Sequence, residues 1–288
     1  MESLLSLAFD NLSAFEPAKI KKGLKQVEGL LAQICLSGPA KREQDAAAAG
    51  GQAQLQRKGL GDLAGDPAFR EFFKLQEGFE WNVAQRLLTT LDFLVARGGE
   101  GQYDLLILNA LDLIQGVLLL HPPSKVLFSR AAHMNLLLDL IEPVNTPAIQ
   151  CATIITLVVA LLDSPANVRV FERLDGLLTV ASLFKSRETG REVKFRLTEF
   201  LYFYLTPEAS PASMASSPTS SSSTPTSPTR DRAGSDTASQ QGSGSKTNGG
   251  VTLSVDVKKR KLDQHLPGVV DALLRDLDRY KPFGGVLS

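Results

Sequence analysis

The sequence is poor in the residues that most often bind metals or form disulfides. Only two of its 288 residues are cysteine and three are histidine. Cys35 and Cys151 both stand in apolar stretches, and His121, His133 and His265 have no histidine or cysteine three or four positions away. Metal sites need such clustered ligands. We therefore predict no metal site, and two buried free thiols in a cytosolic or nuclear protein.

The motifs of catalysis are missing as well. No Gly-rich anion-binding loop follows Cys151, and no serine has the setting of a nucleophile elbow. Residues 242–247 resemble a phosphate-binding loop superficially, but the spacing is wrong and no strand precedes them. Carboxylates such as Asp139 lie on predicted helical surfaces, where they are solvated or paired. The sequence predicts a protein that is not an enzyme and uses no cofactor or small-molecule substrate.

The sequence also has no net charge and no apolar run long enough to span a membrane. The chain has 31 basic and 31 acidic residues, so its overall charge attracts neither nucleic acid nor an anionic membrane. Residues 103–120 are apolar but contain Asp104 and Asp112, and the run 148–162 is shorter than the ~20 residues that span a bilayer. The N-terminus has no basic region typical of a secretory signal. We expect no nucleic-acid partner and no membrane insertion.

Helical periodicity is what the sequence has in abundance. Apolar residues three or four positions apart predict N-terminal helices within residues 1–36, and Asp66-Pro67 is typical of a helix start. Further helices are predicted over 79–97, 103–120 and 190–205. Residues 37–65 are rich in Gly, Ala and Gln and predict a flexible loop. We find no alternating pattern that predicts strands of consequence.

A repeat with a period of about 43 residues runs through the predicted helices of 66–206. It aligns Pro122 with Pro165, Phe128 with Phe171, and Arg130 with Arg173. Such a period is typical of armadillo and HEAT repeats, in which stacked units share one core. The sequence thus predicts an all-α, armadillo-like α-solenoid. We expect each Phe in the core, whereas each Arg either faces a ligand groove or caps a neighbouring helix.

Residues 207–250 consist almost wholly of Ser, Thr, Pro, Gly, Ala and Asn, which predicts a disordered insertion. Ser217, Thr224 and Ser227 each precede a proline and are candidate phosphorylation sites, although a Ser/Pro-rich linker contains such pairs by composition alone. The C-terminal segment 251–288 includes an amphipathic helix over 266–280, which we expect to cap the repeat stack.

A compact basic run precedes this last helix. Lys258, Lys259, Arg260 and Lys261 are consecutive. Such a run is typical of a nuclear import signal or of a contact with an acidic partner. The alternative, which we favour, is a solvated lead-in to helix 266–280.

Several segments together resemble a known family. Residues 103–122, 125–130, 135–141, 146–152 and 167–172 are similar to the fungal septation-initiation component called the cell division control protein fourteen family. Residues 1–34 and the last predicted helix are similar to this family as well. The phosphatase of like name is a different protein, because its cysteine and Gly-rich loop are missing from this chain.

The resemblance implies a regulatory scaffold that binds a germinal-centre-type Ser/Thr protein kinase and promotes septum formation and cytokinesis. It implies a place in the cytoplasm and at the spindle pole body, with nuclear entry if the basic run is an import signal. An armadillo-type peptide-binding adaptor is the alternative. That class usually has more repeats and a ladder of Trp and Asn, whereas Trp81 is the only Trp here.

Overall fold

A computed structural model describes residues 1–36, 58–99, 101–208 and 252–280. These residues are helical and include no β-strand, which confirms the predicted all-α class. The elements are α1 (Glu2–Leu12), α2 (Pro17–Cys35), α4 (Leu60–Gly65), α5 (Pro67–Glu77), α6 (Val83–Arg97), α7 (Asp104–Leu120), the 3₁₀ helix η2 (Pro122–Ser129), α8 (Ala131–Leu140), α9 (Pro147–Leu161), α10 (Pro165–Arg173), α11 (Gly176–Lys185), α12 (Arg191–Leu205), α13 (Val255–Asp263) and α14 (Val270–Tyr280).

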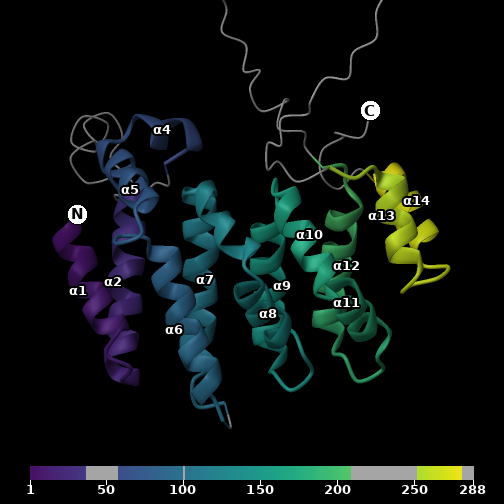
Figure 1. Ribbon diagram of the computed structural model, residues 1–288, viewed down its shortest axis with the longest axis horizontal. Helices are drawn as coiled ribbons and strands as arrows, with labels where there is room; N and C mark the ends of the chain where they lie inside the picture. Colours follow the sequence, from purple (N-terminus) through teal and green to yellow (C-terminus); the bar gives the residue numbers. More distant parts are fainter. Residues whose placement is uncertain (37–57, 100, 209–251, 281–288) are drawn as a thin grey trace, which may run out of the picture.

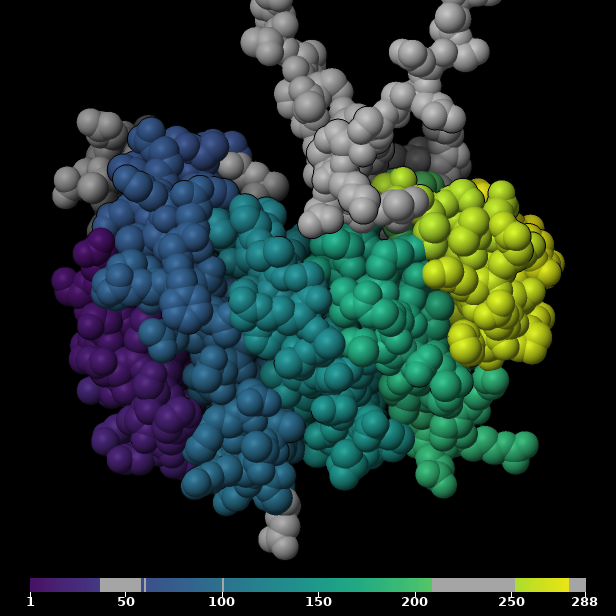
Figure 2. All heavy atoms as spheres, in the orientation of Figure 1, coloured from purple at the N-terminus to yellow at the C-terminus, as the bar shows by residue number. Residues whose placement is uncertain are grey.

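The helices form a row that follows the order of the chain (Figure 1). Within it α2 packs on α7, α7 on α9, and α9 on α12, while α13 and α14 pack on α12. The space-filling view shows the same order as successive bands of colour (Figure 2). Because the main contacts join neighbours along the chain, the arrangement is compatible with an α-solenoid.

The helix starts repeat with a regular spacing. The long helices α7, α9 and α12 begin at Asp104, Pro147 and Arg191, which are 43 and 44 residues apart. The short helices η2 and α10 follow the first two of these, and each begins with a proline at its first position. A proline costs nothing there because the first N–H groups of a helix have no partner in the helix.

Core residues occupy the predicted positions of the repeat. Phe128 and Phe171 are both fully buried, as predicted. Arg130 and Arg173 are exposed, and neither side chain makes a hydrogen bond or ion pair within the described part of the chain. The choice between a groove and a capping role for the two arginines therefore stays open.

The helices α7 and α9 are apolar nearly all round because each is packed between other long helices. In the four described ranges, no single helix is long and apolar enough to cross a membrane. The helices α7 and η2 are long and apolar enough only when they are taken together, and the chain bends by 120° between them.

Three segments differ from the prediction. The helix α4 lies in the predicted loop 37–65, where Asp62 accepts a hydrogen bond from the Gly59 N–H at 3.2 Å. The helix α13 was not predicted because its lysines and aspartates leave only a short apolar stripe. The predicted helix 266–280 begins later, at Val270. Gly268 adopts a φ of 78°, which is not helical, so the residues before Val270 are not part of the helix. Residues 37–57 of the predicted loop and residues 209–251 lie outside the described residues.

Candidate interaction site

Lysine ammonium groups cap three of the long helices at one edge of the row. The last carbonyl groups of a helix have no partner within it and carry the negative end of the helix dipole, so a cation there is favourable. The lysine Nζ atoms donate to backbone carbonyls, Lys58 to Ile34 (3.0 Å), Lys125 to Leu162 (2.8 Å) and Lys258 to Thr206 (2.9 Å). Two of the lysines, Lys125 and Lys258, are buried.

At the end of α12, Glu208 joins three separate parts of the chain. Its carboxylate pairs with Arg169 of α10, lies 3.3 Å from Nζ of Lys258 in α13, and accepts a hydrogen bond from the Leu253 N–H at 2.9 Å. Only 5% of its side chain is exposed. The described ends on either side of 209–251 are therefore tied together at this one carboxylate.

A second carboxylate, Glu172 of α10, extends the network. It accepts a hydrogen bond from the Tyr204 hydroxyl at 2.8 Å and forms ion pairs with Arg169, at 3.3 Å, and Lys261. Burial raises the pKa of Tyr204 well above its usual value, and the negative charge of Glu172 adds to this effect. Tyr204 is therefore held as a neutral donor to Glu172. We call these residues, with Glu208 and Lys258, the ion network.

The pKa of Lys258 is lowered from its usual value because burial disfavours the charged amine, and the carboxylate of Glu208 opposes this effect. The amine also lies 5.3 Å from the centre of the Tyr204 ring. Lys258 thus depends on its protein partners for the stabilisation that water gives to an exposed lysine.

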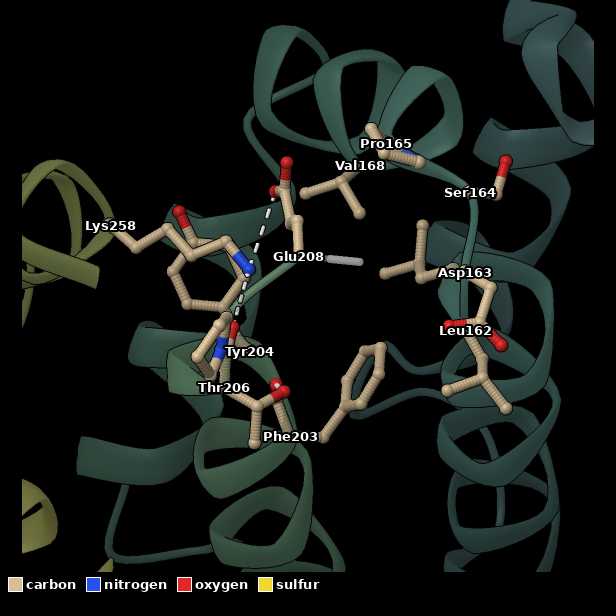
Figure 3. A pocket seen from close by; sticks show the side chains of 12 residues that line it. Leu162, Asp163, Ser164, Pro165, Val168, Phe203, Tyr204, Thr206, Glu208 and Lys258 are labelled. Carbon is tan, nitrogen blue, oxygen red and sulfur yellow. Dashed lines mark hydrogen bonds and ion pairs between the residues drawn. The ribbon is translucent and has the colours of Figure 1, made fainter. Parts of the chain in front are cut away.

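The ion network borders a small cavity of about 50 Å³ (Figure 3). Its lining comes from the α9–α10 connection on one side and from the end of α12 with Lys258 on the other. A larger hollow of about 380 Å³ lies between η2 and α10 and shares Asp163 and Ser164 with the first. The carboxylate of Glu208, which lines the small cavity, is already bonded to cations. We therefore interpret the cavity as part of the contact between helices.

The predicted site residues fall into two groups. Ser217, Thr224 and Ser227 lie outside the described residues, so their phosphorylation stays a prediction. The basic run supplies four of the nine residues of α13 and is part of the fold. Lys258 is 3% exposed, so the expectation of a solvated lead-in is wrong for this lysine, whereas the side chain of Lys261 pairs with Glu172 and is 38% exposed.

Of the other two members of the basic run, Lys259 is partly exposed and Arg260 is exposed. Lys259 pairs with Asp271 at 2.7 Å, and the exposed Arg260 donates to the Asp256 carbonyl at 3.3 Å. The import-signal hypothesis stays untested.

Sequence reasoning missed Arg169, Glu172, Tyr204 and Glu208. The spacing of Arg169 and Glu172, both in α10, was the only local signal, because residues three apart face each other on a helix. Their partners are 32 to 89 residues away along the chain. Contacts between residues so far apart in the chain leave no short motif in the sequence.

The end of α7 is closed by a histidine instead of a lysine. His121 is 1% exposed, and its Nδ1 lies 2.8 Å from Oγ of Ser124, while its Nε2 has no partner among the described residues. Burial lowers the pKa of His121 below its usual 6.5, and the nearby Glu77 partly opposes this. The folded chain therefore favours the neutral imidazole.

This histidine predicts a pH dependence of stability. The unfolded chain takes up a proton on His121 as the pH falls through about 6.5, whereas the folded chain does so only at lower pH. The free energy of unfolding should therefore fall between pH 7.5 and 5.5, by at most about 1.4 kcal/mol per pH unit from this residue. Urea unfolding at the two pH values measures it. The loss should be smaller in His121→Asn, and an equal loss in both proteins would contradict the assignment.

The fold and these contacts define the class of the protein as an all-helical stack whose helix ends are joined by buried ion pairs. Comparison with known proteins identifies the family. The family model described as "Cell division control protein 14, SIN component" matches residues 1–283. The chain is 31% identical over 217 residues to Cell division control protein 14 of Schizosaccharomyces pombe, which covers 72% of this chain and 80% of that protein. No solved structure matches the chain.

The chain therefore belongs to the family of Cell division control protein 14, the septation initiation network component. This confirms the family inferred from the sequence and distinguishes the chain from the phosphatase of like name. Membership in this family supports a role in septation initiation and cell division.

Proposed function

We propose that this protein is a non-catalytic scaffold that binds a germinal-centre-type Ser/Thr protein kinase and thereby promotes septum formation and cytokinesis. The observation that carries the proposal is the family match over residues 1–283, together with the similarity to the fission yeast protein. The elongated helical row supports it, because such a stack offers a large rigid surface to a folded domain (Figure 2).

In physical terms, the scaffold binds one conformation of the kinase more tightly than others and so raises its population. We assign the stack to armadillo-like repeats because three-helix units recur with spacings of 43 and 44 residues. The protein acts in the cytoplasm and at the spindle pole body, and enters the nucleus if the basic run of α13 serves as an import signal.

Affinity purification of the tagged full chain from dividing fungal cells, followed by mass spectrometry, tests the proposal. A germinal-centre-type kinase should be recovered in near-stoichiometric amount, and the two purified proteins should form a complex in size-exclusion chromatography. Recovery of nuclear transport factors instead, or of no stable partner, would refute the kinase assignment and leave only the helical fold and the family.

A peptide-binding adaptor is the second candidate, and one observation favours it. The hollow of about 380 Å³ between η2 and α10 is bordered by Asn167, which is 1% exposed and whose Oδ1 has no partner among the described residues. An extended peptide that opened the hollow as it bound would donate a backbone N–H to that oxygen. A titration separates the candidates, because an adaptor binds short extended peptides whereas the scaffold needs a folded kinase domain.

A further inference from the structure

One face of α2 carries three lysines that the fold does not use. Lys21, Lys22 and Lys25 are exposed and line, with Ala18 and Gln26, an open hollow of about 330 Å³. We call the three lysines the lysine face. Among the described residues none of their side chains makes an ion pair or a hydrogen bond.

The lysine face works against the stability of its own helix. The three residues are the fifth, sixth and ninth of α2, past the first turn in which the helix dipole acts. Lys21 and Lys25 are four positions apart and Lys22 and Lys25 three apart, so they repel each other. Glu16, the acidic residue just before the helix, is paired with Lys19 at 2.9 Å instead. Charges placed against local stability are expected at functional sites.

An exposed aromatic residue stands just before the same helix. Phe15 has a left-handed backbone with a φ of 55°, and its side chain is 49% exposed. A non-glycine residue in this region is strained, and such strain clusters at binding sites. The ring of Phe15 lies 4.5 Å from that of Phe93, and Arg97 lies over Phe93 at 5.2 Å. Aromatic and cationic groups together are typical of interface hot spots.

The two ends of the helical row differ in the kind of side chains that they expose. At the C-terminal end, α14 presents charged residues of both signs, with Asp271 and Asp278 beside Arg275. That mixed polar face is what a terminal cap of a repeat stack requires. At the N-terminal end, drawn in purple in Figure 1, α1 exposes Leu4 and Leu7, at 55% and 49%, and α2 exposes the lysine face.

We propose that the lysine face, together with Phe15 two residues before the start of α2, is the surface that binds an acidic segment of the kinase partner. This inference rests on the proposed function and names the contact that it needs. An acidic protein segment fits better than a nucleic acid, because three lysines within little more than one helical turn are too short a stripe to follow a phosphate backbone. It fits better than a membrane, because the chain has no net charge to attract an anionic surface.

The experiment measures binding of the purified kinase to the full chain and to a variant in which all three lysines of the lysine face become glutamate. Affinity should fall about tenfold or more, because like charges then face each other across the interface. The same variant should unfold within about 2 °C of the wild type, because three like charges at the same spacing repel each other as before and none of them lies in the first turn of the helix. Loss of binding together with an unchanged unfolding temperature excludes misfolding as the cause.

Two matched controls separate local charge from net charge. The variant with arginine at the three positions should keep its affinity within about twofold, because the charge remains. The variant Lys74→Glu, Lys185→Glu, Arg187→Glu changes the net charge by the same amount at exposed positions elsewhere and should also bind normally. Raising the salt concentration should weaken binding of the wild type more than that of the glutamate variant.

The outcomes distinguish this inference from the proposed function. If the wild type and the glutamate variant bind the kinase equally, the lysine face is a solvated surface and only the proposed function stands. If the wild type binds no kinase, both fail. If the glutamate variant keeps the kinase but loses binding to phosphatidylserine vesicles that the wild type binds, the face contacts membranes and the inference is overturned.

Discussion

Glutamine in place of Glu208 is expected to release α13 and α14 from the stack. The carboxylate of Glu208 is bonded to Arg169, Lys258 and the Leu253 N–H in a nearly closed environment. Glutamine keeps the shape but removes the charge, so two cations remain without their main counter-ion. Removing one member of a buried ion pair costs about 3 kcal/mol or more. Because the loss falls at the joint between α12 and α13, it should appear as undocking of the last two helices.

Hydrogen exchange measured by mass spectrometry checks this expectation. Amides of α13 and α14 should lose protection in Glu208→Gln, whereas those of α7 and α9 should not. The control is Asp271→Asn, which removes the partner of Lys259 at the surface and should leave exchange unchanged. Equal protection of α13 in Glu208→Gln and in the wild type would show that the apolar contacts of Leu262 and Leu266 hold these helices by themselves.

The sequence is sufficient to predict the helices that bury an apolar stripe. Spacing of apolar residues located α2, α6, α7 and α12 because each of these helices must bury one side. The repeat predicted the buried positions of Phe128 and Phe171, because equivalent positions in stacked units face the same core.

The ion network could not be predicted from the sequence, for a physical reason. Charged residues in a polar segment are usually solvated, so the run that begins at Lys258 predicts a surface. Its burial depends on Glu208 and Glu172, which come close only after α10 and α12 have stacked. Likewise α4 has few apolar residues, and Lys58, which pairs with Asp66, fixes its position. Both segments take their structure from tertiary contacts instead of local periodicity.

Alanine at Gly176 is expected to destabilise the protein, although the same change in an open helix stabilises it. A Cβ atom at Gly176 would lie 2.2 Å from Cε2 of Phe171. The ring is fully buried and lies 5.5 Å from that of Phe200, so it has no room to turn away. Overpacking of this kind costs about 1–3 kcal/mol. Gly29 in α2 is the matched control, because nothing lies within 4 Å of its added Cβ. Gly29→Ala should stabilise by about 0.5–1 kcal/mol.

A double-mutant cycle with Phe171 shows whether the ring is the cause. Phe171→Ala alone should cost about 3–5 kcal/mol, because it leaves a cavity where α10 meets α12. In that background the ring is gone, so Gly176→Ala should cost nothing or stabilise slightly. The coupling energy, from urea unfolding of the four proteins, should then be about 1–3 kcal/mol, with the double variant more stable than the sum of the two changes predicts. Additive losses would instead place the strain in the backbone at Asp175, whose φ is 56°, and not in the contact with the ring.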